Sequence, residues 1–167
     1  MLKGIEMSQI DWDEYFINMC SNVAEKSKDP STKIGAIVVG PDREIRSTGF
    51  NGFARGVKDL PERYADRKIK YPMTAHAEFN CVCQAARVGT SLKDCTIYIQ
   101  AMPCTNCSLA IIQSGIREIV VDGKNKPDAA FLERWKEESD LAETMLSEAG
   151  VVIRETNKSG RHEEYRR

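Results

Sequence analysis

The sequence predicts an α/β protein that folds as a three-layer α/β/α sandwich around a five-stranded mixed sheet. Two observations carry this prediction. First, stretches with helical spacing of apolar residues alternate with short runs rich in β-branched residues. Second, a Gly or Pro residue marks most of the boundaries between these stretches. The chain has 167 residues, 41% of them hydrophobic, which is enough for one domain. We therefore expect residues 1–167 to form a single domain, with its core over about residues 11–154 and a charged tail at residues 155–167.

The N-terminal part of the chain begins with a helix and a hairpin. Residues 11–28 place apolar side chains at helical spacing, and Asp11 can cap the helix. Residues 33–40 and 45–50 have the composition of two strands, and the Pro-Asp turn between them is typical of a hairpin. Residues 51–73 are rich in Gly, Pro and charge, so we expect a long loop there, of the kind that often serves function.

The C-terminal part alternates helices with strands. The predicted helices cover residues 74–89, 103–115 and 128–149, and the predicted strands cover residues 95–101, 117–121 and 150–154. We expect Thr74 and Pro103 to start the first two of these helices, and Gly89 and Gly115 to end them. Because strands joined through a helix run parallel and hairpin strands run antiparallel, the sheet is mixed.

Charge and hydropathy narrow the class of protein. Lys and Arg number 24 against 25 Asp and Glu, so no global basic field would attract a nucleic acid. The sequence has no run of about 18 apolar residues that could span a membrane, and acidic residues interrupt the N-terminal stretch where a signal peptide would be apolar. We therefore expect a cytoplasmic protein with neither a nucleic-acid partner nor a membrane anchor.

The chain contains six cysteines. Thiols stay reduced in the cytoplasm, so clustered cysteines there indicate metal ligands before they indicate disulfides. Cys104 and Cys107 have the spacing of a metal-binding pair. The other four lie among apolar neighbours, where a free thiol packs as a small hydrophobic side chain. These four are Cys20, Cys81, Cys83 and Cys95.

One histidine and one glutamate complete a candidate metal site. Two thiolates three residues apart span one edge of a tetrahedron, and His76 adds a third ligand, which leaves the fourth position open for catalysis. Both ligand segments open predicted helices, whose N-terminal dipoles stabilise thiolates and anionic oxygen. Glu78 lies two residues after His76 and is placed to move the protons of a metal-bound water.

Simpler interpretations of these residues are also consistent with the sequence. A structural zinc site needs a fourth side chain, but His162 lies in the polar tail. Glu78 by itself could serve only to compensate a helix dipole. A zinc-binding module that binds a protein partner without catalysis would have no need of Glu78, which favours the enzyme.

The two motifs together match a known signature. His76 to Glu78 and Pro103 to Cys107 form H-x-E…P-C-x-x-C, the signature of zinc deaminases. The stretches "SKDPSTKIGAIVV", "STGFNGF", "HAEFN" and "IIQSGIREIVV" further resemble segments of the deoxycytidylate deaminase family, in the same order. The resemblance covers about residues 11–154. It implies the cytidine deaminase fold, one Zn²⁺ per chain on the two cysteines and the histidine, and hydrolysis of dCMP to dUMP and ammonia for thymidylate synthesis.

The resemblance also implies roles for further residues. Metal-activated water would attack C4 of the cytosine, and Glu78 would carry its proton to N3. Asn51 is assigned to the deoxyribose hydroxyl, although Asn-Gly is also a turn signal. The backbone N–H of Ala77 is assigned to the pyrimidine oxygen. Tyr98 would flank the base, although an aromatic residue on a strand is as often part of the core. The cations available for the 5′-phosphate are Lys33, Lys28, Arg55 and Arg117.

Regulation and assembly are expected from the resemblance alone. Many members of this family are hexamers that dCTP activates and dTTP inhibits. The loop that contains Phe50 and Gly52 would then couple substrate and effector sites, with Lys28 and Arg55 as partners of effector phosphates. Some phage relatives bind a second zinc in a Cys- and His-containing insertion, whereas residues 53–73 contain neither residue type, so we expect one zinc per chain.

The zinc motif does not specify the base, so other deaminases on the same scaffold stay in question. Their substrates would be tRNA adenosine, guanine or a riboflavin precursor. The balanced charge of the chain disfavours tRNA, and the stretches "GFNG" and "QSGI" favour the nucleotide monophosphate enzyme. The choice among dCMP, its 5-substituted forms and dCTP is left open.

Overall fold

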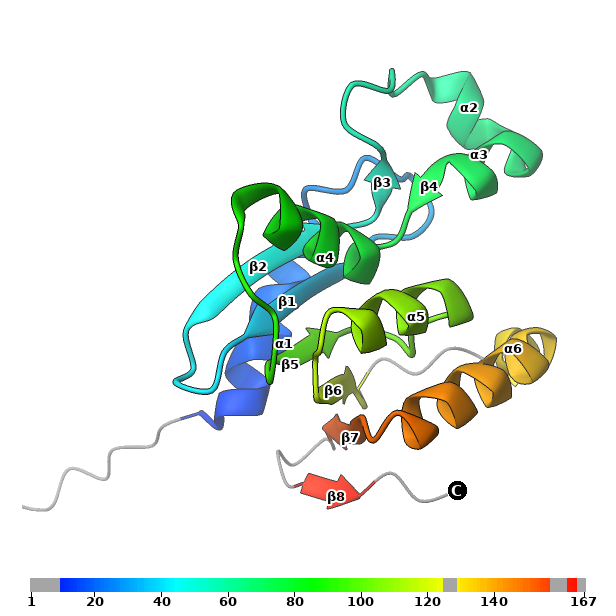
Figure 1. Cartoon of the computed structure of the whole chain (residues 1–167). Helices are drawn as coiled ribbons and strands as arrows, with labels where there is room; N and C mark the ends of the chain where they lie inside the picture. Colours follow the sequence, from blue (N-terminus) through cyan, green and yellow to red (C-terminus); the bar gives the residue numbers. More distant parts are fainter. Residues whose placement is uncertain (1–9, 125–128, 157–161, 165–167) are drawn as a thin grey trace, which may run out of the picture.

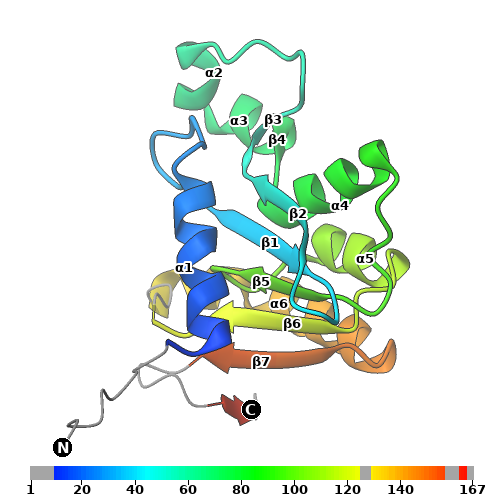
Figure 2. The ribbon, with the colours of Figure 1, turned by 90° about the vertical axis from the view of Figure 1, so that its left-hand side faces the viewer.

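The computed structural model describes residues 10–124, 129–156 and 162–164, and a six-stranded sheet with helices on both faces dominates it (Figures 1 and 2). The strands, in their order across this sheet, are β2 (Ile45–Phe50), β1 (Gly35–Val39), β5 (Thr96–Ile99), β6 (Glu118–Asp122), β7 (Val152–Thr156) and β8 (His162–Glu164). The helices that cover it are α1 (Trp12–Ala24), α4 (Ala77–Val88), α5 (Thr105–Gln113) and α6 (Ala129–Glu148). The predicted α/β/α class is confirmed, and all the predicted strands are present.

The directions of the strands follow from how they are connected. β1 pairs antiparallel with β2 through the predicted hairpin and also antiparallel with β5. β5, β6 and β7 run parallel, because α5 and α6 carry the chain back between them. The carboxyl end of β5 therefore opens onto the sheet edge from which α5 starts, and this edge becomes the site.

The C-terminal tail contributes a strand beyond the five predicted. β8 pairs antiparallel with β7, so the sheet has one strand more than the five predicted. The stretch at residues 162–164 is polar and charged, so its composition carried no strand signal. Residues 1–9, 157–161 and 165–167, which belong to the predicted single domain and its tail, lie outside the described residues.

Side-chain alternation along the strands builds one core on each face of the sheet. The core beneath α4, α5 and α6 contains Ile97, Ile99 and Ile119, all fully buried. The core beneath α1 contains residues that alternate with these along the same strands, including Tyr98 and Val120. Figure 2 shows α1 on one side of the sheet and α4 and α5 on the other. The face of the sheet to which a strand residue points thus decides whether its side chain can reach the site.

Several predicted helix ends are confirmed. The Asp11 side chain accepts a hydrogen bond from the N–H of Asp13 at 2.9 Å and caps α1. Gly89 ends α4 in the left-handed conformation, with φ of 74°. Within the described ranges, no helix combines the length and the apolar composition that crossing a bilayer requires.

The prediction of a long loop at residues 51–73 is wrong. This segment forms β3 (Gly52–Phe53), α2 (Pro61–Ala65) and α3 (Arg67–Met73), and β3 pairs with β4 (Thr74–Ala75) in a small second sheet. Both helices are short, and Lys70 is the one residue within them that is buried. Without an apolar face, the segment has no hydrophobic periodicity to reveal it, and contacts with the rest of the chain hold it.

The cysteines divide nearly as predicted. Cys20, Cys81 and Cys95 are fully buried, as expected of small core side chains. Cys83 is exposed, so its assignment to the core is wrong, because it lies on the outer side of α4. All six cysteines belong to the described residues, and all are free thiols.

Candidate active site

Two helices begin side by side over the same edge of the sheet, and each has a ligand as its N-cap residue. His76 is the N-cap of α4 and Cys104 is the N-cap of α5, both in extended conformation. Cys107 follows in the first turn of α5. The starts predicted at Thr74 and Pro103 come slightly too early relative to these caps. The correction puts both ligands at the N-termini themselves, where unpaired N–H groups favour anions.

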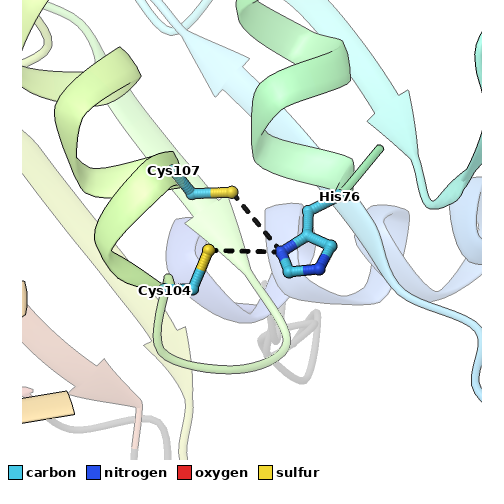
Figure 3. A group of neighbouring side chains, drawn as sticks. All are labelled: His76, Cys104 and Cys107. Atoms are coloured by element: carbon cyan, nitrogen blue, oxygen red, sulfur yellow. Dashed lines mark hydrogen bonds between the residues drawn. The ribbon is translucent and has the colours of Figure 1, made fainter. Parts of the chain in front are cut away.

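The three side chains fit a tetrahedral zinc ion. The Nδ1 atom of His76 lies 3.4 Å from the Sγ atom of Cys104 and 3.6 Å from the Sγ atom of Cys107 (Figure 3). Zn–S and Zn–N bonds of about 2.3 and 2.05 Å at a tetrahedral angle place S and N about 3.6 Å apart. All three ligand atoms lie within 4.8 Å of one another. The donor set is the zinc set expected from the sequence.

The ligand side chains shift one another's pKa values. Hydrogen bonds from Cys107 and then from His76 lower the pKa of the Cys104 thiol, so this sulfur ionises readily. The contact with Cys104 also raises the pKa of His76, and the carboxylate of Glu138 on α6 adds to this shift. Glu138 accepts a hydrogen bond from Thr105 Oγ1 at 3.2 Å, beside Cys104. Sequence reasoning missed Glu138, because an acidic residue on a charged helix carries no signal of its place.

Glu78 lies next to this cluster without belonging to it. Only 5% of its surface is exposed, and burial raises the pKa of its carboxyl group to about 6. The negative charge of Glu78 raises the pKa of His76 and of Cys107, so the carboxyl group lies near these two ligands. A buried carboxyl group with a pKa near neutrality beside an open metal position can both accept and release a proton.

Asn51 stands close to the ligands, but its amide is already engaged. Gly52 pairs with Ala75 in the small β3–β4 sheet, which places Asn51 near His76 along the neighbouring strand. Its Oδ1 accepts from the N–H of Ile34 at 2.8 Å, and its Nδ2 donates to the carbonyl of Thr32 at 2.9 Å. Asn51 therefore fixes the shape of the preceding loop, while the second proton of Nδ2 and a second lone pair of Oδ1 stay available to a substrate hydroxyl.

Ala77 has the position that its predicted role requires. It is the first residue of α4, directly between His76 and Glu78, and its side chain is fully buried. The first N–H groups of a helix have no partner within the helix. The N–H of Ala77 is thus a donor of the kind that can bind a pyrimidine oxygen beside the metal.

Tyr98 is not brought to the site. It alternates with Ile97 and Ile99 on β5, so its ring lies on the α1 face, against Phe16 at a ring-centroid distance of 4.9 Å. Its hydroxyl group donates to Asp13 at 2.8 Å. The predicted contact with the base is corrected to a core role, because the site lies on the opposite face of the sheet.

The predicted phosphate and effector residues are scattered around the site. Lys33 is exposed on the loop before β1. Lys28 forms an ion pair with Asp59 at 2.6 Å, and Arg55 donates to Gln84. Arg117 lies at the opposite end of the sheet, where its backbone N–H bonds the carbonyl of Cys95, so it cannot reach the metal site. Phe50 is 39% exposed at the end of β2, and Gly52 begins β3 beside it.

The fold and this site define a class of protein. An α/β/α sandwich that gathers one His, two Cys and a buried Glu at two helix N-termini is a zinc-dependent hydrolytic deaminase. Residues 10–122 match the family described as the cytidine and deoxycytidylate deaminase zinc-binding region. The chain belongs to the cytidine and deoxycytidylate deaminase family, and its metal is Zn²⁺.

Known relatives agree with this assignment. The deoxycytidylate deaminase of Homo sapiens is 33% identical over 150 residues, covering 87% of this chain and 79% of the human protein. An uncharacterized deaminase from the luxG 3′ region of Aliivibrio fischeri is 39% identical over 142 residues, covering 85% of this chain and 91% of that protein. The crystal structure of the cyanophage S-TIM5 dCMP deaminase with dCMP and dUMP has a TM-score of 0.68 at 22% identity, covering 89% and 99% of the two chains. This last likeness shows a shared fold.

Proposed function

We propose that the protein hydrolyses dCMP to dUMP and ammonia, and so supplies dUMP for thymidylate synthesis. One observation carries the chemistry: a buried Glu78 beside three zinc ligands that are spaced for a tetrahedral ion with an open position. The identity to deoxycytidylate deaminases over most of the chain favours this substrate.

The chain's own residues can perform each proton transfer of the reaction. His76, Cys104 and Cys107 would hold Zn²⁺, which supplies the nucleophile when bound by lowering the pKa of a water from about 15.7 toward 7. Glu78 accepts a proton from this water as oxygen attacks C4, and it gives the proton to ring N3. Glu78 then transfers the second proton to the departing amine, which leaves as ammonia while the C4–N bond breaks. The pKa near 6 lets one carboxyl group serve as base and then as acid.

The remaining contacts orient the substrate. The N–H of Ala77 donates to the pyrimidine oxygen, and the free Nδ2 proton of Asn51 donates to the deoxyribose hydroxyl. The exposed position of Lys33 supports a role toward the 5′-phosphate, because the 27–34 loop that carries it is bonded directly to Asn51.

Assembly and regulation form a second part of the proposal. We propose a homohexamer that dCTP activates and dTTP inhibits, with Phe50 and Gly52 coupling the substrate and effector sites. The support is their place at the end of β2 and the start of β3, on either side of Asn51. Arg55 and Lys28 would exchange their present partners for effector phosphates.

The free thiols of all six cysteines support a reducing compartment such as the cytoplasm.

A panel of substrates tests the function. Ammonia release is measured with cytosine, deoxycytidine, dCMP, 5-methyl-dCMP and dCTP, and also with guanine, a tRNA adenosine stem-loop and the riboflavin precursor. We expect the highest kcat/KM for dCMP, and sigmoidal dCMP kinetics that dCTP makes hyperbolic. Highest activity on guanine, tRNA or the riboflavin precursor would contradict the substrate assignment. No activity on any of them, with zinc bound, would favour a non-catalytic zinc-binding module.

A further inference from the structure

A buried ion pair lies outside the metal site and has no part in the chemistry described above. Lys70 of α3 and Asp29 of the loop before β1 are 7% and 2% exposed, and the Nζ atom of Lys70 lies 2.7 Å from Oδ1 of Asp29. The same Nζ atom donates to Oγ of Ser31 at 2.6 Å. Burying two charges is costly unless they are paired and hydrogen-bonded, so a pair within a mostly exposed segment calls for a reason.

Asp29 is the centre of a network that shapes the 27–34 loop. Its Oδ1 also accepts hydrogen bonds from the N–H and Oγ of Ser31, both at 2.9 Å, and from the N–H of Thr32 at 3.1 Å. Burial would raise the pKa of Asp29, but Lys70 and these donors outweigh it and leave the pKa lowered. Asp29 is therefore a carboxylate that the loop and Lys70 hold in one geometry.

This loop in turn holds Asn51. The carbonyl of Thr32 and the N–H of Ile34 bind the amide of Asn51, and Oγ of Ser27 donates to its backbone carbonyl at 2.8 Å. The N–H of Asn51 donates to the carbonyl of Ile34 at 3.1 Å. The loop thus fixes both the backbone and the side chain of Asn51.

The other end of Lys70 leads directly to the metal ligand. The Lys70 carbonyl accepts a hydrogen bond from Oγ1 of Thr74 at 2.8 Å, and Thr74 and Ala75 form β4 immediately before His76. The pair of Lys70 and Asp29 therefore ties the segment that enters His76 to the loop that holds Asn51. Figure 1 shows the short helices α2 and α3 joined to the sandwich through β3 and β4.

We propose that Lys70 is a positioning residue that acts through Asp29: it sets the place of Asn51 relative to the metal site and so determines the affinity for the nucleotide. The inference rests on the proposed function, in which Asn51 binds the sugar. A residue of this kind affects substrate binding more than the chemical step, because Glu78 and both cysteine ligands lie at the starts of α4 and α5, and of the metal site His76 alone directly follows the tied segment.

The test compares three variants in the full-length, zinc-loaded protein. Lys70→Met removes the charge and keeps the length of the side chain. Asp29→Asn combined with Lys70→Met removes both charges, while the amide oxygen that replaces the carboxylate can still accept from Ser31 and Thr32. Lys68→Met makes the same chemical change at an exposed position of the same helix and serves as the control. Zinc content, Tm, and kcat and KM for dCMP are measured for each.

For Lys70→Met we expect a KM for dCMP raised at least about tenfold, a kcat within about threefold of the native value, and unchanged zinc content. Its Tm should fall by about 10 °C, because Asp29 is left buried without its partner. The double variant should recover most of the Tm but keep the raised KM, and the control should match the native protein in every quantity.

Three results would overturn the positioning role. The first is a native KM in a folded Lys70→Met protein. The second is a double variant that recovers KM together with Tm, which would show that the pair acts through stability alone. The third is failure of both variants to fold. The proposed function itself is tested separately, by the activity of the native protein. A native protein that does not deaminate dCMP would refute it.

Discussion

Gly49 offers a direct test of how α4 is placed on the sheet. It lies on β2, paired with Ala36, and packs against the beginning of α4. A Cβ atom at this position would lie 2.3 Å from the carbonyl oxygen of Ala77 and 2.6 Å from the backbone nitrogen of Cys81. A carbon and an oxygen that are not bonded need about 3.3 Å, so the start of α4 must move about 1 Å away from β2 in Gly49→Ala.

Two consequences follow from this displacement. Overpacking of a rigid contact lowers the free energy of unfolding by about 1–3 kcal/mol. Because Ala77 lies between His76 and Glu78, a shift of about 1 Å also misplaces the proton carrier relative to the metal, which can lower kcat/KM by about a hundredfold. The loss of activity should therefore be much larger than the loss of stability alone would cause.

The assay measures Tm, zinc content and dCMP deamination of Gly49→Ala below its unfolding temperature. Gly52→Ala is the matched control, because a Cβ atom at Gly52 meets no atom within 4 Å, and it is assayed without nucleotide effectors. Native kcat/KM and native Tm in Gly49→Ala would refute the claim that contact with β2 sets the position of α4.

Three further predictions concern the core, the metal and acid stability. Tyr98→Phe should lose about 2 kcal/mol in urea unfolding, because Asp13 loses a buried donor, while KM for dCMP stays native; a raised KM at native stability would return Tyr98 to the substrate site. Cys104→Ala should lose both the metal and dCMP turnover, and retained zinc by metal analysis would exclude Cys104 as a ligand. Asp29 has a lowered pKa in the folded state, so its stabilisation is complete above its ordinary pKa and is lost as the pH falls through the lower folded value, below about pH 4. Lys70→Met raises that pKa, so acid unfolding followed by circular dichroism should begin at a higher pH than in the native protein, and an unchanged midpoint would contradict the pairing.

The metal site was predictable because its signals are local and chemically rare. His76, Cys104 and Cys107 lie in two short motifs, and each motif begins a helix, so the sheet topology had only to bring two helix starts together. The geometry of the cluster then follows from the fold. Glu78 was predictable for the same reason, since its spacing from His76 is fixed within one turn.

The contacts around the site were less predictable, because they depend on which way side chains face. Tyr98 lies on a strand with apolar residues on both faces. The face to which its ring points therefore could not be predicted without knowing where α1 packs. Asn51 carries a turn signal and a family role at once, and only the structure shows that Ile34 occupies its oxygen. Lys70 lies in a charged segment, where nothing in the composition indicates that its ammonium group is buried.

One measurement tests the central claim most directly: zinc content and dCMP turnover determined on the same sample of Glu78→Gln. Glutamine keeps the shape of this buried side chain but cannot carry a proton, so we expect one zinc per chain, as in the native protein, and a loss of kcat of at least about a hundredfold. Loss of zinc would make Glu78 a ligand, and native turnover with zinc bound would remove Glu78 from the mechanism.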